Sequence, residues 1–115
     1  MHVFSDDRGR SAMSILDHVE DLPGQFNAST MYAGAVKAWH RHALQDDYWI
    51  PLSGDMKIGL FNSEDSQMTT ELRVASGAPN DEAVVKIILP ANSGKAIYLG
   101  EHRPGVLHIP AGMWH

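Results

Sequence analysis

The sequence lacks cysteine altogether, so disulfide bonds and thiolate metal sites are excluded from this chain. It also lacks an apolar run of the roughly eighteen residues that a membrane-spanning helix needs. Its Lys and Arg residues form no cluster and the formal net charge is −5, which argues against nucleic acid as a partner. The N-terminal stretch MHVFSDDRGR carries charges where a signal peptide has an apolar core, so we expect a cytoplasmic protein without a membrane partner.

The chain has 115 residues, of which 43% are hydrophobic, and this size and composition predict a single globular domain over residues 1–115. Short apolar stretches alternate with turn residues along most of the chain. Met56, Ile58 and Leu60, for example, alternate with more polar or smaller neighbours, a pattern typical of a strand with one buried face. Many short strands at near-regular spacing predict an all-β sandwich or barrel.

The expected strands are 31–40, 45–52, 56–62, 69–75, 83–89, 96–100 and 106–110, with a polar loop at 76–82. A helix is expected only in SAMSILDHVEDL, residues 11–22, with Ser11 as its N-cap.

Seven histidines are many for a chain of this length, and histidine is both a proton carrier near neutral pH and the commonest metal ligand. His40 and His42 are two residues apart, so in an extended strand their side chains project from the same face. Asp47 follows on the next expected strand, and the PxGxxH turn at 110–115 presents His115. Together these four side chains form a set suited to Zn, Fe, Mn or Ni.

The spacing of these residues resembles two sequence motifs of the cupin superfamily. Gly34, His40, His42, Asp47 and Gly54 are similar to the first cupin motif, with Asp where that motif usually has Glu. The PxGxxH turn is similar to the core of the second motif. The resemblance implies a cupin jelly roll, a sandwich or barrel of antiparallel strands.

Further segments resemble the dTDP-4-dehydrorhamnose 3,5-epimerase family. These are FSDDRG at 4–9, QFNAS at 25–29 leading into GAVKAWH at 34–40, and IPAGMWH at 109–115. The resemblance implies inversion of carbons 3 and 5 of a 4-keto sugar without a cofactor, with His40 as the base and His115 as a second histidine lining the pocket. It also implies substrate contacts from Arg8, Gln25, Asn27 and Lys37.

Two departures separate the chain from this family. The family's lysine, which supports the enolate, falls at Asp47, and a carboxylate there opposes a developing negative charge. The family's acid tyrosine and the aspartate that orients the base lie beyond the position of His115. We therefore expect that the intact protein continues past His115 with further strands.

Three function classes stay open on these observations. The first is an epimerase or isomerase acting on a dTDP-4-keto-6-deoxy sugar, and the second is a cupin enzyme that depends on a divalent metal. The third is a non-catalytic sugar-binding cupin. We expect a small nucleotide sugar as the ligand. We also expect a homodimer, because an open sheet edge gains from being covered. Trp39, Trp49 and Trp114 are expected to serve packing rather than sugar stacking.

Overall fold

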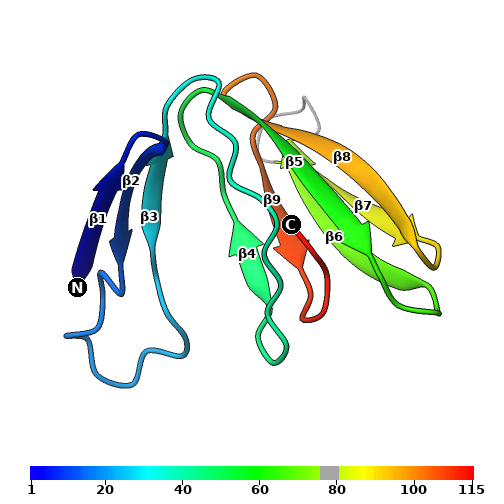
Figure 1. Ribbon diagram of the computed structural model, residues 1–115, viewed down its shortest axis with the longest axis horizontal. Coiled ribbons are helices and arrows are strands. Elements are labelled where there is room, and N and C mark those ends of the chain that lie inside the picture. Colours follow the sequence, from blue (N-terminus) through cyan, green and yellow to red (C-terminus); the bar gives the residue numbers. More distant parts are fainter. Residues whose placement is uncertain (76–80) are drawn as a thin grey trace. The chain divides into compact units, whose positions relative to one another are not determined.

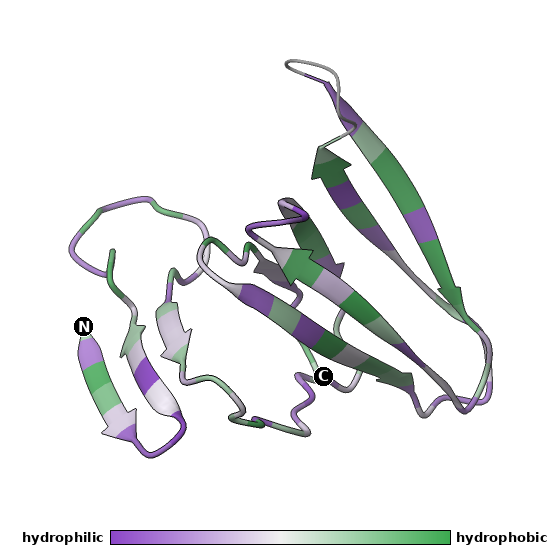
Figure 2. Ribbon diagram, turned by 90° about the horizontal axis from the view of Figure 1, so that it is seen from above, coloured by the Kyte–Doolittle hydropathy of each residue, from purple (hydrophilic) through white to green (hydrophobic). Residues whose placement is uncertain are grey.

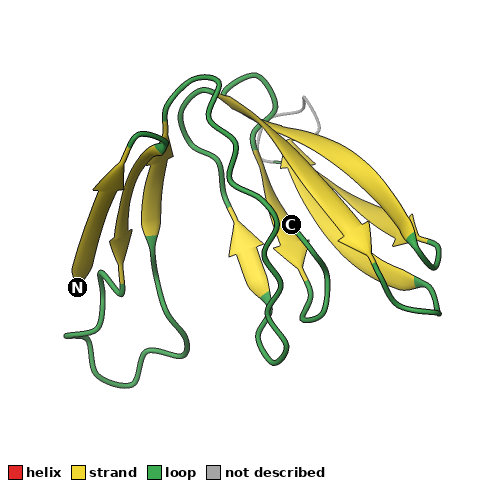
Figure 3. Cartoon of the chain, in the orientation of Figure 1, coloured by secondary structure: helices red, strands yellow, loops and turns green. Residues whose placement is uncertain are grey.

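The computed structural model describes residues 1–75 and 81–115, and every regular element among them is a β-strand (Figure 1, Figure 3). All strand pairs are antiparallel, which confirms the predicted all-β fold. The loop predicted at 76–82 falls mostly on residues 76–80, outside the described part of the chain. Within the described ranges, no helix has the length and apolar character to cross a membrane.

Contacts within the chain divide it into two compact units, Met1–Ala38 and Trp39–His115. The expectation of one domain over residues 1–115 stays a prediction. The first unit holds a three-stranded sheet in which the central strand β2 (Gly9–Met13) pairs with both β1 (His2–Asp6) and β3 (Ala28–Met31).

The helix predicted over residues 11–22 is wrong. Ser11 pairs across the sheet with both Phe4 and Ser29, so the expected N-cap lies inside β2. Beyond β2 the chain forms turns, and Ser14 has a positive φ of 52°, which a right-handed helix does not accommodate. Pairing on both edges of β2 gives these backbone groups partners that the local sequence pattern does not reveal.

The second unit is a sandwich of two sheets. One has the strand order β4 (Asp47–Trp49), β9 (Gly105–Ile109), β6 (Met68–Ala75) and β7 (Glu82–Leu89). The other pairs β5 (Asp55–Asn62) with β8 (Ser93–Gly100). Figure 2 shows alternating bands of hydrophobic and hydrophilic residues along the longer strands, as strands with one buried face require.

The core of this unit lies between the two sheets. Ile58 and Leu60 on β5 are buried while Lys57 and Phe61 are exposed, which confirms the alternation predicted for this segment. The buried core residues come from both sheets and from the segment after β9: Ile58, Leu60, Leu72, Val74, Ile87, Leu89, Ile97, Leu99, Leu107, Ile109 and Met113. Burial of this apolar surface is the main force that holds the sheets together.

The strand predicted over residues 31–40 is also wrong. Strand β3 ends at Met31, and the backbone then turns, with the Ala35 N–H donating to the Tyr32 carbonyl at 3.0 Å. Gly34 in this turn has a φ of +80°, a conformation that glycine adopts readily. The segment carrying His40 and His42 therefore lies outside the strand ladders of the described structure.

Candidate active site

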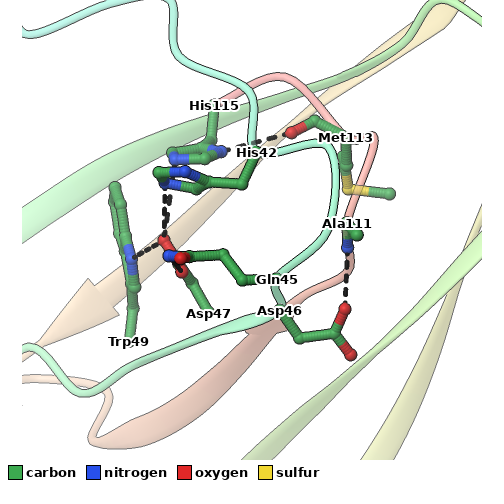
Figure 4. A network of polar contacts seen from close by, with 8 residues as sticks. All are labelled: His42, Gln45, Asp46, Asp47, Trp49, Ala111, Met113 and His115. Carbon is green, nitrogen blue, oxygen red and sulfur yellow. Dashed lines mark hydrogen bonds and ion pairs between the residues drawn. The ribbon is translucent and has the colours of Figure 1, made fainter. Parts of the chain in front are cut away.

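Three of the predicted site residues meet in the second unit. The side chains of His42, Asp47 and His115 offer ligand atoms that all lie within 4.8 Å of one another (Figure 4). Asp47 Oδ2 lies 3.5 Å from His42 Nε2 and 3.8 Å from His115 Nε2. His115 is buried, Asp47 is mostly buried and His42 is half-exposed, so the group opens to solvent on the His42 side.

Asp47 reaches the group because it begins β4. It pairs with Ile109 of β9, and Trp49 pairs with Leu107, so the two residues share the core face of this sheet. The intervening Tyr48 pairs with His108 on the opposite face. The alternation of side chains along β4 thus points Asp47 toward the core.

His115 reaches the group through the PxGxxH turn. The Met113 N–H donates to the Pro110 carbonyl at 3.2 Å, and Gly112 takes a positive φ of 88°. After the turn, the backbones of His40 and His115 exchange two hydrogen bonds, of 2.7 and 2.9 Å. The turn therefore returns the chain beside the histidine segment that precedes β4.

His40 lies next to the trio rather than within it. Its side chain is exposed, and its ring centroid is 6.4 Å from that of His115, compared with 5.5 Å between His42 and His115. The predicted four-residue metal set is thus brought together as three residues, with His40 alongside His115. The backbone of His40 is hydrogen-bonded to that of His115, and its side chain lies at the exposed border of the site.

Burial sets the protonation of His115. The pKa of His115 is lowered from its ordinary value mainly because burial disfavours the charged imidazolium, an effect that the Met113 carbonyl and Asp47 oppose. His115 Nδ1 lies 3.2 Å from the Met113 carbonyl oxygen, which only accepts hydrogen bonds, so Nδ1 carries the proton of the neutral ring. The lone pair then resides on Nε2, which faces Asp47 and can accept a proton or bind a metal.

This lowered pKa predicts a dependence of stability on pH. Between the folded pKa and the unfolded value of about 6.5, the unfolded chain binds more protons at His115. The free energy of unfolding should therefore fall as the pH drops below about 6.5. Tm, measured by thermal denaturation at values from about pH 8 to pH 5, should fall more steeply with decreasing pH in the parent protein than in His115→Phe, since the variant lacks the titrating group. Parallel curves would show that His115 titrates alike in both states.

Two neighbours of Asp47 were not predicted as site residues. Trp49 Nε1 donates to Asp47 Oδ2 at 3.4 Å, and its ring stands edge-on to His115 at 5.2 Å between centroids. Gln45 Nε2 donates to Asp47 Oδ1 at 3.1 Å. The two-residue spacing from Asp47 to Trp49 was the available signal, because i and i+2 share a face in a strand.

The residues expected to contact substrate lie in the first unit, and Arg8, Gln25 and Asn27 have polar partners there. The Arg8 guanidinium pairs with Asp6 at 2.7 Å. Gln25 Nε2 donates to Ser14 Oγ at 2.6 Å, and the Ser14 N–H donates to Asn27 Oδ1 at 2.7 Å. These amides therefore hold the turn that follows β2.

Gln25 also lines a hollow of about 390 Å³ within the first unit, together with Ser14 and Phe26, while Lys37 is half-buried in the same unit. A common pocket formed by these side chains and His40 would need residues of both units, so this pocket stays a prediction.

No family model and no solved structure matches the chain. The chain is 32% identical over 114 residues to the spore coat polysaccharide biosynthesis protein SpsL of Bacillus subtilis, covering 96% of this chain and 61% of SpsL. It is 28% identical over 120 residues to the "Probable low-salt glycan biosynthesis epimerase Agl13" of Haloferax volcanii, covering 100% of this chain and 63% of Agl13. The chain is thus similar, over about three-fifths of their length, to proteins named for polysaccharide and glycan biosynthesis.

Proposed function

We propose that the protein is a sugar epimerase or isomerase of polysaccharide or glycan biosynthesis. Its substrate is a dTDP-4-keto-6-deoxy sugar, whose carbonyl acidifies the protons on the two flanking carbons. The names of both relatives support sugar biosynthesis, and one of them is named as an epimerase. The observation that carries the chemistry is that His40 and His115 lie side by side, with their backbones hydrogen-bonded to each other and their ring centroids 6.4 Å apart.

Epimerisation next to a carbonyl needs a group that removes a proton and a group that returns one. In the proposed mechanism His40 removes the proton from the carbon beside the carbonyl, and the electron pair moves onto the carbonyl oxygen to give an enolate. A proton from solvent then enters at the other face of that carbon and restores the carbonyl, while His40 gives its proton back to solvent. His115 lies beside His40 with its Nε2 lone pair unprotonated at neutral pH, which makes it a second proton-handling group.

Deuterium exchange tests this function. The parent protein is incubated in D2O with a dTDP-4-keto-6-deoxy sugar. The mass of the sugar is then measured by mass spectrometry and compared with that in a sample without protein. We expect deuterium to enter the sugar faster in the presence of the protein. Binding of the sugar without accelerated exchange would contradict the proposed epimerase or isomerase activity and favour a non-catalytic sugar-binding protein.

A second candidate function is a metal-dependent cupin enzyme, and the spacing of the trio favours it. Donor atoms around one tetrahedral ion at roughly 2.0–2.2 Å lie about 3.4 Å apart. The separations of 3.5 and 3.8 Å between Asp47 and the two histidines are near this spacing, and all three ligand atoms lie within 4.8 Å of one another. A bound divalent ion supplies a Lewis acid that polarises a carbonyl group. It also offsets the charge of Asp47, which stands where the family resemblance expects a lysine.

A further inference from the structure

A second carboxylate–histidine pair lies on the opposite face of the sheet from the trio. Asp46 Oδ2 lies 2.8 Å from His108 Nε2, and because a carboxylate only accepts, Nε2 carries the proton. The His108 ring stacks on that of Tyr48, its partner across β4 and β9, with 4.8 Å between centroids and 20° between planes. His108 is thereby held from two sides, by a ring and by a carboxylate.

The other oxygen of Asp46 binds the PxGxxH turn. Asp46 Oδ1 accepts the Ala111 N–H at 2.8 Å (Figure 4), and next to it the Gly112 N–H donates to the His42 carbonyl at 2.8 Å. One side chain thus joins three segments: the loop before β4, the end of β9 and the turn that precedes His115. These same segments carry the trio, since Asp47 follows Asp46 directly and His42 lies four residues before it.

We propose that Asp46 and His108 form a positioning pair that sets the separation between His115 and its two neighbours, His42 and Asp47. The pair touches no reacting atom. It acts by fixing the turn to the loop, so that the imidazoles of His42 and His115 keep one mutual arrangement. The catalytic consequence of this arrangement rests on the proposed function, whereas the arrangement itself does not.

The chain contains a matched control for this pair. Asp55 Oδ2 lies 2.6 Å from His102 Nδ1, and Asp55 Oδ1 accepts the His102 N–H at 3.1 Å. This pair has the same chemistry, one carboxylate holding an imidazole and a backbone N–H, but it joins the start of β5 to the turn after β8. None of the trio lies in those two segments.

The test is NMR of the histidine rings in 15N-labelled protein, recorded well below the Tm of each variant. Asp46→Ala and His108→Phe should both shift or broaden the ring resonances of His42 and His115. His108→Phe keeps an aromatic ring on Tyr48, so only the hydrogen bond is lost. Asp46→Asn retains an oxygen for the Ala111 N–H and should restore part of the parent spectrum. Asp55→Ala should leave both rings unchanged.

The proposal is overturned if the two ring signals of Asp46→Ala and His108→Phe superimpose on those of the parent, even where Tm falls. The proposal is also overturned if Asp55→Ala shifts the two ring signals by as much as Asp46→Ala does. This readout requires no substrate, so it stands whether or not the parent protein exchanges deuterium into a sugar. Where exchange is observed, Asp46→Ala should lower kcat by roughly 10- to 100-fold, the usual cost of losing an outer partner of a site, with a smaller change in KM.

Discussion

Replacing His40 by glutamine is expected to lower the rate of proton exchange beside the sugar carbonyl by roughly 10²- to 10⁴-fold, the usual contribution of a general base. Glutamine has a polar side chain of comparable size but cannot take up a proton at neutral pH. The two backbone hydrogen bonds between His40 and His115 do not depend on the side chain, which is exposed. The fold and sugar binding should therefore persist, and exchange is measured by mass spectrometry in D2O.

His102→Gln is the matched control for this change, because His102 is exposed and lies outside the site. Its exchange rate should equal that of the parent. A His40→Gln variant that exchanges as fast as the parent would remove His40 from the mechanism. A fall in the free energy of unfolding of about 0.5–3 kcal/mol without a specific loss of exchange would assign His40 a structural role instead.

The second large effect concerns metal affinity. If His42, Asp47 and His115 hold a divalent ion, His42→Ala removes one of three ligands. The loss of affinity should exceed the roughly 10- to 100-fold that removal of an outer partner costs. Isothermal titration with Zn²⁺ into the metal-free protein measures this directly. Asp47→Asn should act in the same direction, because a neutral amide is a weaker ligand than a carboxylate.

Two further variants define this metal test. His40→Ala should retain most of the affinity, since the ring of His40 lies outside the group of three ligand atoms. His102→Ala controls for adventitious binding to an exposed histidine. Equal affinity of the parent and His42→Ala for Zn²⁺ would contradict a metal centre at the trio.

The strands with a clear two-residue period could be predicted from the sequence. In β5, hydrophobic residues recur at every second position, and burial of one face is sufficient to decide which side chains point inward. The conformations of segments 31–40 and 11–22 are not decided by their own hydrophobic pattern. Their conformation depends on the turn around Gly34 and on the pairing of β2 with two neighbours, neither of which local hydrophobicity encodes.

Parts of the site could also be predicted, from the spacing of residues in the sequence. The spacing of His42, Asp47 and the PxGxxH turn predicted a common location, and the three side chains do meet. The positions of Trp49 and Gln45 around Asp47 depend on the register of β4 against β9. The hydrogen bond between Asp46 and His108 spans 62 residues of sequence, and only the folded sheet brings these residues together.

Position-resolved NMR of a dTDP-4-keto-6-deoxy sugar, incubated with the protein in D2O, measures the proposed chemistry most directly. The chemistry predicts that deuterium enters only at carbons 3 and 5, which flank the carbonyl at carbon 4, because only those protons are acidified. It further predicts that the rate falls in His40→Gln and is unchanged in His102→Gln. Absence of deuterium at both carbons with folded parent protein, or equal rates in the parent and His40→Gln, would contradict proton removal by His40.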